Sequence, residues 1–170
     1  FYPVSCFFFQ IILAKGQVLR YGKGTTKQGG LQMIEEAKEL AKRFLDEKTY
    51  LHSQRVAAFT EENPMIPPAL KEHCIALAWL HDLWEDSACP AEEILSLDSG
   101  QKLTVHMHYI THRIQEKTYE EYIRSIKNAQ ELYPEVWWVK LADMKDHLSQ
   151  RETLTQRLKD KYTRALAILL

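Results

Sequence analysis

The stretch PPALKEHCIALAWLHDLWED, residues 67–86, decides the fold. Its two prolines predict a helix start, because proline lacks an N–H group and is tolerated in the first helical turn. Apolar residues then lie on nearly every side as far as Leu80, which predicts a central helix that is buried all round. The stretch ends in His81-Asp82, followed one turn later by Glu85-Asp86. Polar groups of these types at the end of a buried helix predict a functional site there.

The rest of the chain from Met33 onward also predicts helices, with no alternating pattern of strand length. Amphipathic segments or helix-start residues predict further helices over 34–45, 50–59, 98–110, 118–129, 134–148 and 153–170, and a short helix that begins at Pro90. Thr118 and Glu121 have the spacing of a capping box, and Asp98-Ser99 can cap the helix that follows. We therefore expect an all-α fold, a compact bundle of about seven to eight helices in a single domain over 33–170.

The first 32 residues differ in composition from the rest. They contain four basic residues and no acidic one, whereas residues 33–170 carry 18 basic and 23 acidic residues. The codons of Gln28-Gly29-Gly30 can include a purine-rich ribosome-binding sequence at a suitable spacing before Met33. We therefore expect the native protein to start at Met33 and residues 1–32 to be translated upstream sequence. The alternative is a disordered N-terminal arm.

Charge and composition exclude several classes of function. The chain has 22 basic and 23 acidic residues and a formal net charge of -1, so no polybasic surface for nucleic acid is expected. The apolar run over residues 1–14 is too short to span a bilayer, so no membrane partner is expected. Cys6, Cys74 and Cys89 lack the paired spacing of zinc ribbons, and their odd number predicts reduced thiols in the cytoplasm. The oligomeric state is left open.

Three predicted helices carry imidazole and carboxylate groups among apolar neighbours: His52, His81-Asp82 and Asp143. A buried carboxylate without a partner is costly, so Asp143 within Val139–Asp143 predicts a cation beside it. Adjacent helical residues point about 100° apart, so His81 and Asp82 can share an ion only at the inner edge of their helix. These residue types together predict a divalent-metal site.

Three stretches resemble the signatures of the HD superfamily of metal-dependent phosphohydrolases: YLHSQRVA at 50–57, ALAWLHDLWED at 76–86 and VKLAD at 139–143. The order His, His-Asp, Asp is the pattern of that superfamily. The Glu-Asp pair, the segment 111–123 and the KLAD sequence resemble more narrowly the hydrolase domain of RelA/SpoT-type ppGpp enzymes. The Lys145-Asp146-His147-Leu148 stretch is similar to short standalone HD proteins of bacteria. The resemblance covers roughly residues 34–165.

The resemblance implies a role for each matching residue. One divalent ion would be bound by His52, His81, Asp82 and Asp143. In this group the ion is often manganese, with magnesium, iron or zinc as alternatives. Beside the attacking water, Glu85 and Asp86 would orient or deprotonate it and manage the proton of the leaving group. Residues expected to bind substrate are Arg55, Lys140, His147, His112, Tyr119 and Tyr122. For some of these an ordinary role is also open: Arg55 can pair with an acid, Lys140 can be a surface lysine, and both tyrosines can be core.

We expect a phosphohydrolase that cleaves a phosphate or pyrophosphate bond of a nucleotide-like small molecule, with (p)ppGpp 3'-pyrophosphohydrolase as the narrower form. Three positions differ from the ppGpp enzymes: 42–48 lacks their His-x-Gly-Gln stretch, Ser53 replaces a proline, and His147 replaces an asparagine. These differences concern the nucleotide and leave hydrolysis in place. The alternatives are a deoxynucleotide 5'-phosphatase and a non-catalytic regulatory module that binds metal or nucleotide.

Overall fold

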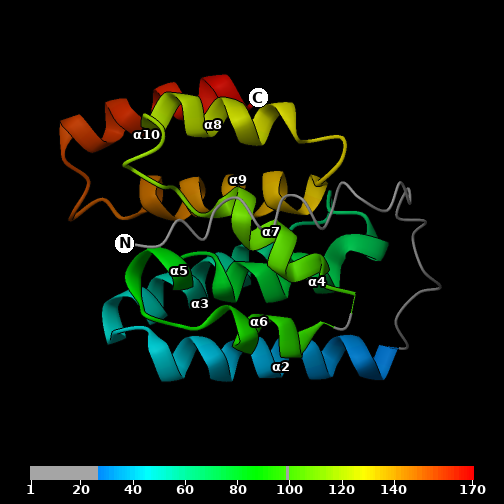
Figure 1. The fold of residues 1–170 in the computed structure, drawn as a ribbon. Coiled ribbons are helices and arrows are strands. Elements are labelled where there is room, and N and C mark those ends of the chain that lie inside the picture. The colour runs from blue at the N-terminus through cyan, green and yellow to red at the C-terminus, as the bar shows by residue number, and fades with distance from the viewer. Residues whose placement is uncertain (1–26, 99) are drawn as a thin grey trace.

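The computed structural model describes residues 27–98 and 100–170 (Figure 1). They form eight helices and one single helical turn, α5, without any β-strand among these residues. The elements are α2 (Lys27–Phe44), α3 (Glu47–Glu62), α4 (Pro68–Leu80), α5 (Leu83–Asp86), α6 (Ala91–Leu97), α7 (Lys102–Ile110), α8 (Tyr119–Asn128), α9 (Pro134–Ser149) and α10 (Gln156–Leu169). The all-α prediction is confirmed for the described residues.

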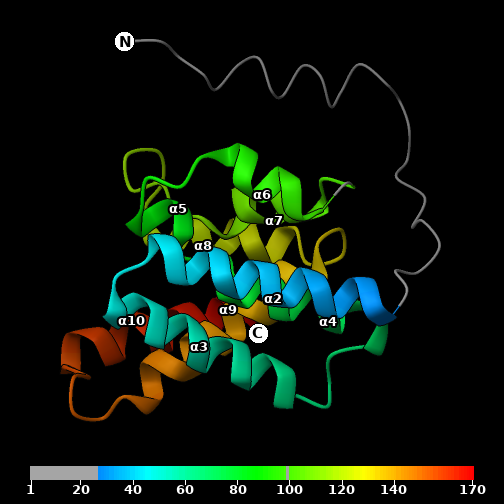
Figure 2. The same ribbon diagram turned by 90° about the horizontal axis from the view of Figure 1, so that it is seen from below.

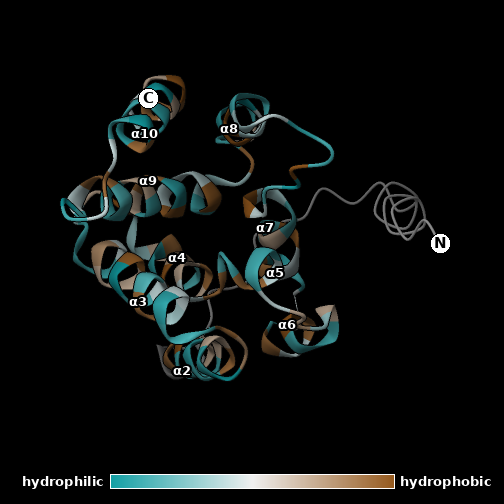
Figure 3. Cartoon of the chain, turned by 90° about the vertical axis from the view of Figure 1, so that its left-hand side faces the viewer, coloured by the Kyte–Doolittle hydropathy of each residue, from teal (hydrophilic) through white to brown (hydrophobic). Residues whose placement is uncertain are grey.

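The helices are stacked in layers, which Figures 1 and 3 show from the side and from one end. Helices α2 and α3 pack on α4, and both α3 and α4 pack on α9. On the other side of α9, helices α8 and α10 pack on α9 and on each other. Helix α7 lies against α4 and α9, while α6 contacts both α2 and α7. Figure 2 shows α5 and α6 on one side of α2 and α3 on the other. Helices α4 and α9 are therefore central, and both lead to the predicted site.

Helix α4 is the buried centre that the opening stretch predicts. Every residue from Cys74 to Leu80 is buried, and Leu77 and Leu80 are fully so. Burying one such leucine contributes about 1.5–3 kcal/mol to the free energy of unfolding. The helix ends at Leu80, and His81 and Asp82 form a turn before α5. This break lets two adjacent side chains approach one point, which a continuous helix permits only at its inner edge.

Side-chain caps define two of the helix starts. The predicted capping box is confirmed: Thr118 accepts from the backbone N–H of Glu121, and the Glu121 carboxylate accepts from the backbone N–H of Thr118. Helix α3 begins at Glu47 rather than at residue 50, because Asp46 accepts from the N–H of Thr49 at 2.7 Å. A carboxylate at that position satisfies a donor that the first helical turn leaves unpaired.

Helices α7 and α10 begin slightly later than the sequence predicts. Asp98 lies outside α7, although one of its oxygens accepts from the backbone N–H of Leu103 at 3.1 Å. Its predicted partner in capping, Ser99, lies outside the described residues. Helix α10 is capped by Thr155, which accepts from the N–H of Leu158 at 3.3 Å. The start of α10 is thus set by its capping side chain, whereas the N-cap residue of α7, Gln101, makes no side-chain capping bond.

Helix α2 begins at Lys27, before the predicted domain start at Met33. Residues 27–32, which the sequence assigns to the N-terminal segment, therefore belong to this helix. Residues 1–26 lie outside the described part of the chain, and a translation start at Met33 stays a prediction. The helix contacts the core through a stripe of residues spaced three or four apart: Met33, Ala37, Leu40 and Ala41.

Candidate metal centre

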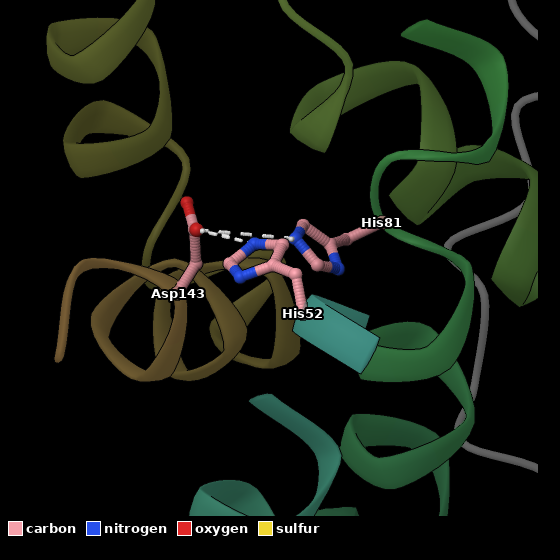
Figure 4. A group of neighbouring side chains, drawn as sticks. All are labelled: His52, His81 and Asp143. Carbon is pink, nitrogen blue, oxygen red and sulfur yellow. Dashed lines mark hydrogen bonds and ion pairs between the residues drawn. The ribbon is translucent and has the colours of Figure 1, made fainter. Parts of the chain in front are cut away.

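Three buried side chains from different parts of the fold meet at one point (Figure 4). His52 lies on α3, His81 follows the last residue of α4, and Asp143 lies on α9. One ligand atom from each lies within 4.8 Å of the other two. The packing of α3, α4 and α9 against one another brings these residues together from positions far apart in the sequence.

The donor atoms have the separations of ligands around one cation. Nε2 of His52 lies 3.2 Å from Nε2 of His81 and 3.2 Å from Oδ1 of Asp143, while Nε2 of His81 lies 3.9 Å from that oxygen. Asp82 adds a carboxylate, with Oδ1 3.2 Å from Nε2 of His81 and Oδ2 3.5 Å from Nε2 of His52. All four metal ligands predicted from the sequence therefore lie together.

The second nitrogen of each imidazole is already bonded. Nδ1 of His52 lies 2.7 Å from an Asp146 oxygen, and Nδ1 of His81 lies 2.8 Å from the carbonyl oxygen of Ala78. A carboxylate and a carbonyl only accept hydrogen bonds, so both Nδ1 atoms carry a proton. The lone pair of each neutral ring is then on Nε2, and the two Nε2 atoms face each other. This tautomer is the one in which both rings can bind the same metal ion.

Asp143 provides the clearest indication that a cation can bind at this point. It is buried, and Lys140 Nζ lies 2.7 Å from its Oδ2. Its Oδ1 lies 3.2 Å from Nε2 of His52 and 3.1 Å from Nε2 of His147, yet no described group forms a well-aligned hydrogen bond with it. A buried carboxylate oxygen in this state is costly unless a ligand satisfies it. The residues present therefore fit a bound cation.

The acidic side chains of the site stabilise positive charge within it. Burial opposes protonation of His52, but the carboxylates of Asp143 and Asp146 next to its two ring nitrogens outweigh burial and raise the pKa of His52 to about 9. For His81 burial is likewise outweighed, by the charge of Asp82, so its pKa is raised. Burial would favour the neutral form of Asp143, but the nearby Lys140 ammonium holds its pKa well below the usual range. Groups that hold a proton on His52 in this way can equally hold a metal ion.

Glu85 and Asp86 lie on α5 beside the site and are solvent-exposed. Oε1 of Glu85 accepts from the backbone N–H of His112 at 2.5 Å, which fixes the carboxylate. Partial desolvation, with the negative charge of Asp82 as a further cause, raises the pKa of the Glu85 carboxyl. Desolvation and Asp82 also raise the pKa of Asp86. Two acids with raised pKa values next to a candidate metal site can serve as proton donors or acceptors.

Two residues expected to bind substrate, Arg55 and Lys140, contact acids of the candidate site. The Arg55 guanidinium forms two hydrogen bonds to Asp146, from Nε to Oδ1 at 2.8 Å and from a terminal nitrogen to Oδ2 at 3.0 Å. Lys140 is buried against Asp143 and lies 5.0 Å from the centre of the Tyr122 ring, so it is not a surface lysine. The sequence leaves open whether Arg55 binds substrate or pairs with an acid, and the structure shows the pair, with Asp146.

Of the other residues expected to bind substrate, His147 lies at the candidate metal centre, whereas Tyr122 belongs to the core. The His147 ring is stacked between those of His52 and Tyr162, at centroid distances of 4.7 and 4.4 Å. Tyr122 is buried and donates from its hydroxyl to the Ile110 carbonyl, so it is a core residue. The His112 ring stacks on Tyr122 at 4.7 Å.

Helix α10 contributes a basic cavity that sequence reasoning missed. The cavity has a volume of about 480 Å³ and is lined by Thr155, Arg157, Leu158, Lys161 and Arg164. A smaller cavity beside it shares Lys161 and Arg164 and includes Tyr119. The i, i+4, i+7 spacing of the three basic residues would have revealed a one-sided basic face, but not that it lies near the metal site.

The cavity is linked to the metal site through Tyr119. Lys161 Nζ lies 3.9 Å from the centre of the Tyr119 ring, and Lys140 Nζ lies 5.9 Å from the same centre. Within the described part of the chain, Arg157, Lys161 and Arg164 form no ion pair with an acid. Burial and the charge of Lys140 lower the pKa of Lys161. These cations are therefore available to an anionic ligand.

Asp146 is the other residue that sequence reasoning did not assign. It is fully buried, and although burial alone would raise its pKa, hydrogen bonds from His52 and Arg55 lower the value to about 2. Its spacing of three residues from Asp143 places both carboxylates on one face of α9. That spacing was the available signal in the sequence.

Comparison of the chain with family models and with curated proteins gives no match. None of the helices in the described residues is long and apolar enough to cross a membrane. The site is therefore interpreted from its own geometry and from the sequence resemblance.

Proposed function

We propose that the protein is a metal-dependent phosphohydrolase that cleaves a phosphate or pyrophosphate bond of a nucleotide-like small molecule. The observation that carries this proposal is the meeting of two imidazole Nε2 atoms with the unsatisfied, buried Oδ1 of Asp143. Two exposed acids with raised pKa values lie next to this group. A purely structural metal site needs its ligands but has no use for such acids.

The proposed cofactor is one divalent ion held by His52, His81, Asp82 and Asp143. Imidazole nitrogens suit iron or zinc and carboxylate oxygens suit manganese, whereas magnesium prefers an all-oxygen set of ligands. We take Mn²⁺ as the first ion to test. When bound, the ion would polarise the phosphoryl oxygen and lower the pKa of the attacking water.

The protein's own groups supply proton transfer and orientation. The bond from the His112 backbone holds Glu85 Oε1, so the other carboxylate oxygen can face the attacking water and take its proton. Asp86, one residue further along α5, can return a proton to the leaving oxygen. Lys140 holds Asp143 ionised and oriented toward the site. Each of these tasks uses a group whose position and pKa are set by contacts already present.

The basic cavity on α10 supports a phosphate-bearing substrate. Arg157, Lys161 and Arg164 offer three cations, and Tyr119 offers an aromatic face between the cavity and Lys140. A cavity of about 480 Å³ is within the size range of small-molecule sites. We propose that phosphate groups away from the scissile bond bind there. A (p)ppGpp 3'-pyrophosphohydrolase activity and a cytoplasmic location remain the narrower proposals, the latter consistent with the free, buried Cys74 and Cys89.

The test is release of phosphate or pyrophosphate from a panel of nucleotides, including ppGpp and deoxynucleoside monophosphates, with and without Mn²⁺. We expect Mn²⁺-dependent turnover of at least one compound, and its loss in Asp82→Ala. Pyrophosphate release supports the ppGpp-like activity, and phosphate release from a deoxynucleotide supports the phosphatase. If wild type and Asp82→Ala behave alike on every compound, the enzyme proposal fails and a non-catalytic module remains.

A further inference from the structure

We propose that Asp146, held by Arg55, is a positioning residue that fixes the orientation and tautomer of the metal ligand His52. This inference rests on the proposed metal site and assigns a role that the sequence did not suggest. Arg55, for which the sequence leaves open an acid pair or a phosphate contact, supports the metal site in this proposal.

The contacts join two helices at the ligand. Asp146 lies on α9, one turn after Asp143, and is fully buried. Its Oδ2 accepts from Nδ1 of His52 at 2.7 Å, across from α3. Arg55, one turn after His52 on α3, donates to both Asp146 oxygens at 2.8 and 3.0 Å. Gln150 Nε2 also donates to Oδ1 at 3.2 Å, so three side chains fix the carboxylate and it cannot turn without breaking one of these bonds.

This arrangement determines which His52 nitrogen is available to a metal. An accepting carboxylate at Nδ1 leaves the lone pair on Nε2, the atom that faces His81 and Asp143. It also holds the ring plane and makes the nitrogen a stronger donor. Without Asp146, the neutral ring could exchange tautomers and rotate, and each change would remove its lone pair from the site.

A role in folding alone would produce a different result from a positioning role. A structural carboxylate affects the free energy of unfolding but leaves the affinity of the folded protein for metal unchanged. A positioning residue changes metal affinity and the coordination spectrum even when the fold is intact. Partners of this kind change metal affinity by about 10- to 100-fold.

The experiment compares metal binding by wild type, Asp146→Asn, Asp146→Ala and Arg55→Gln. Mn²⁺ affinity is measured by calorimetry, and the coordination geometry by visible absorption of the Co²⁺-loaded protein. We expect Asp146→Ala to weaken Mn²⁺ binding about 10- to 100-fold and to alter the Co²⁺ spectrum. Asp146→Asn keeps an oxygen acceptor and should recover part of the affinity, while Arg55→Gln should lose several-fold.

Glu135→Gln is the matched control, because Glu135 is also a fully buried carboxylate on α9 paired with a basic residue, Lys102. It should change stability but neither the Mn²⁺ affinity nor the Co²⁺ spectrum. Circular dichroism identifies folded variants, and Asp146→Asn keeps the test valid if the alanine variant unfolds. Unchanged affinity in folded Asp146 variants would overturn this inference alone, whereas a wild type that binds no metal would overturn the proposed function.

Discussion

Replacing Lys140 by methionine tests whether this lysine supports the metal site or binds substrate. Methionine keeps an unbranched apolar side chain but removes the ammonium that lies 2.7 Å from Asp143 Oδ2. Both side chains are buried, so the change leaves a buried carboxylate without its strongest cation. Breaking such a pair costs about 3–5 kcal/mol. His52 and His147 still face Asp143, so we expect the lower end of that range.

The assay is denaturant and thermal unfolding with EDTA and with saturating Mn²⁺. A cost of about 3 kcal/mol corresponds to a fall in Tm of roughly 6–12 °C for a chain of this size. The cost should be smaller with Mn²⁺, because the ion supplies positive charge beside Asp143. Lys145→Met, an exposed position on the same helix, is the control and should cost less than about 1 kcal/mol. A Lys140→Met cost below about 1 kcal/mol, or one that Mn²⁺ leaves unchanged, would show that Lys140 does not stabilise the Asp143 carboxylate at a metal site.

Three further predictions concern the cavity, the proton-transfer residue and pH. Lys161→Gln should raise KM for a phosphate-rich substrate about tenfold, equivalent to about 1.4 kcal/mol, with little change in kcat. The control is Lys159→Gln, on the same helix outside the cavity lining, which should leave KM unchanged. An equal rise in KM for both variants would argue against substrate binding in the cavity. Glu85→Gln should lower kcat by about 10²–10⁴-fold while Mn²⁺ affinity measured by calorimetry stays near wild type; retained turnover would remove Glu85 from its role. Burial, partly offset by Glu135, lowers the pKa of His106 to about 4. The unfolded chain therefore binds more protons at this residue between pH 6.5 and 4, and stability should fall by about 3 kcal/mol as the pH drops through that window. Urea unfolding of wild type and His106→Gln across this range measures the difference, and parallel curves would contradict it.

The sequence predicts most of the fold because its signals are local. The prolines before α4 and the capping box at Thr118 act within a few residues, and both are confirmed. The start of α3 was misplaced because Asp46, rather than an apolar pattern, begins that helix. The break at His81 and Asp82 was not predicted, since a run of good helix formers gives no local reason for it.

For the candidate site too, local sequence signals identify some residues, and contacts between distant helices determine the others. The four predicted ligands could be identified because unusual polar residues stand within apolar helices, and the structure brings them together. The role of Asp146 depends on contacts with α3, more than 90 positions away, which no spacing rule encodes. The basic face of α10 is visible in the sequence, but its place beside Tyr119 depends on how α8 and α10 pack. Substrate identity therefore stays a prediction.

Anomalous diffraction at the manganese edge, from crystals grown with Mn²⁺, would locate the proposed ion directly. We expect one peak per chain, within bonding distance of Nε2 of His52, Nε2 of His81 and a carboxylate oxygen of Asp143. The peak should be absent from His81→Ala crystals. A wild-type crystal without a peak there, or with manganese bound only elsewhere, would show that these residues do not form a manganese site.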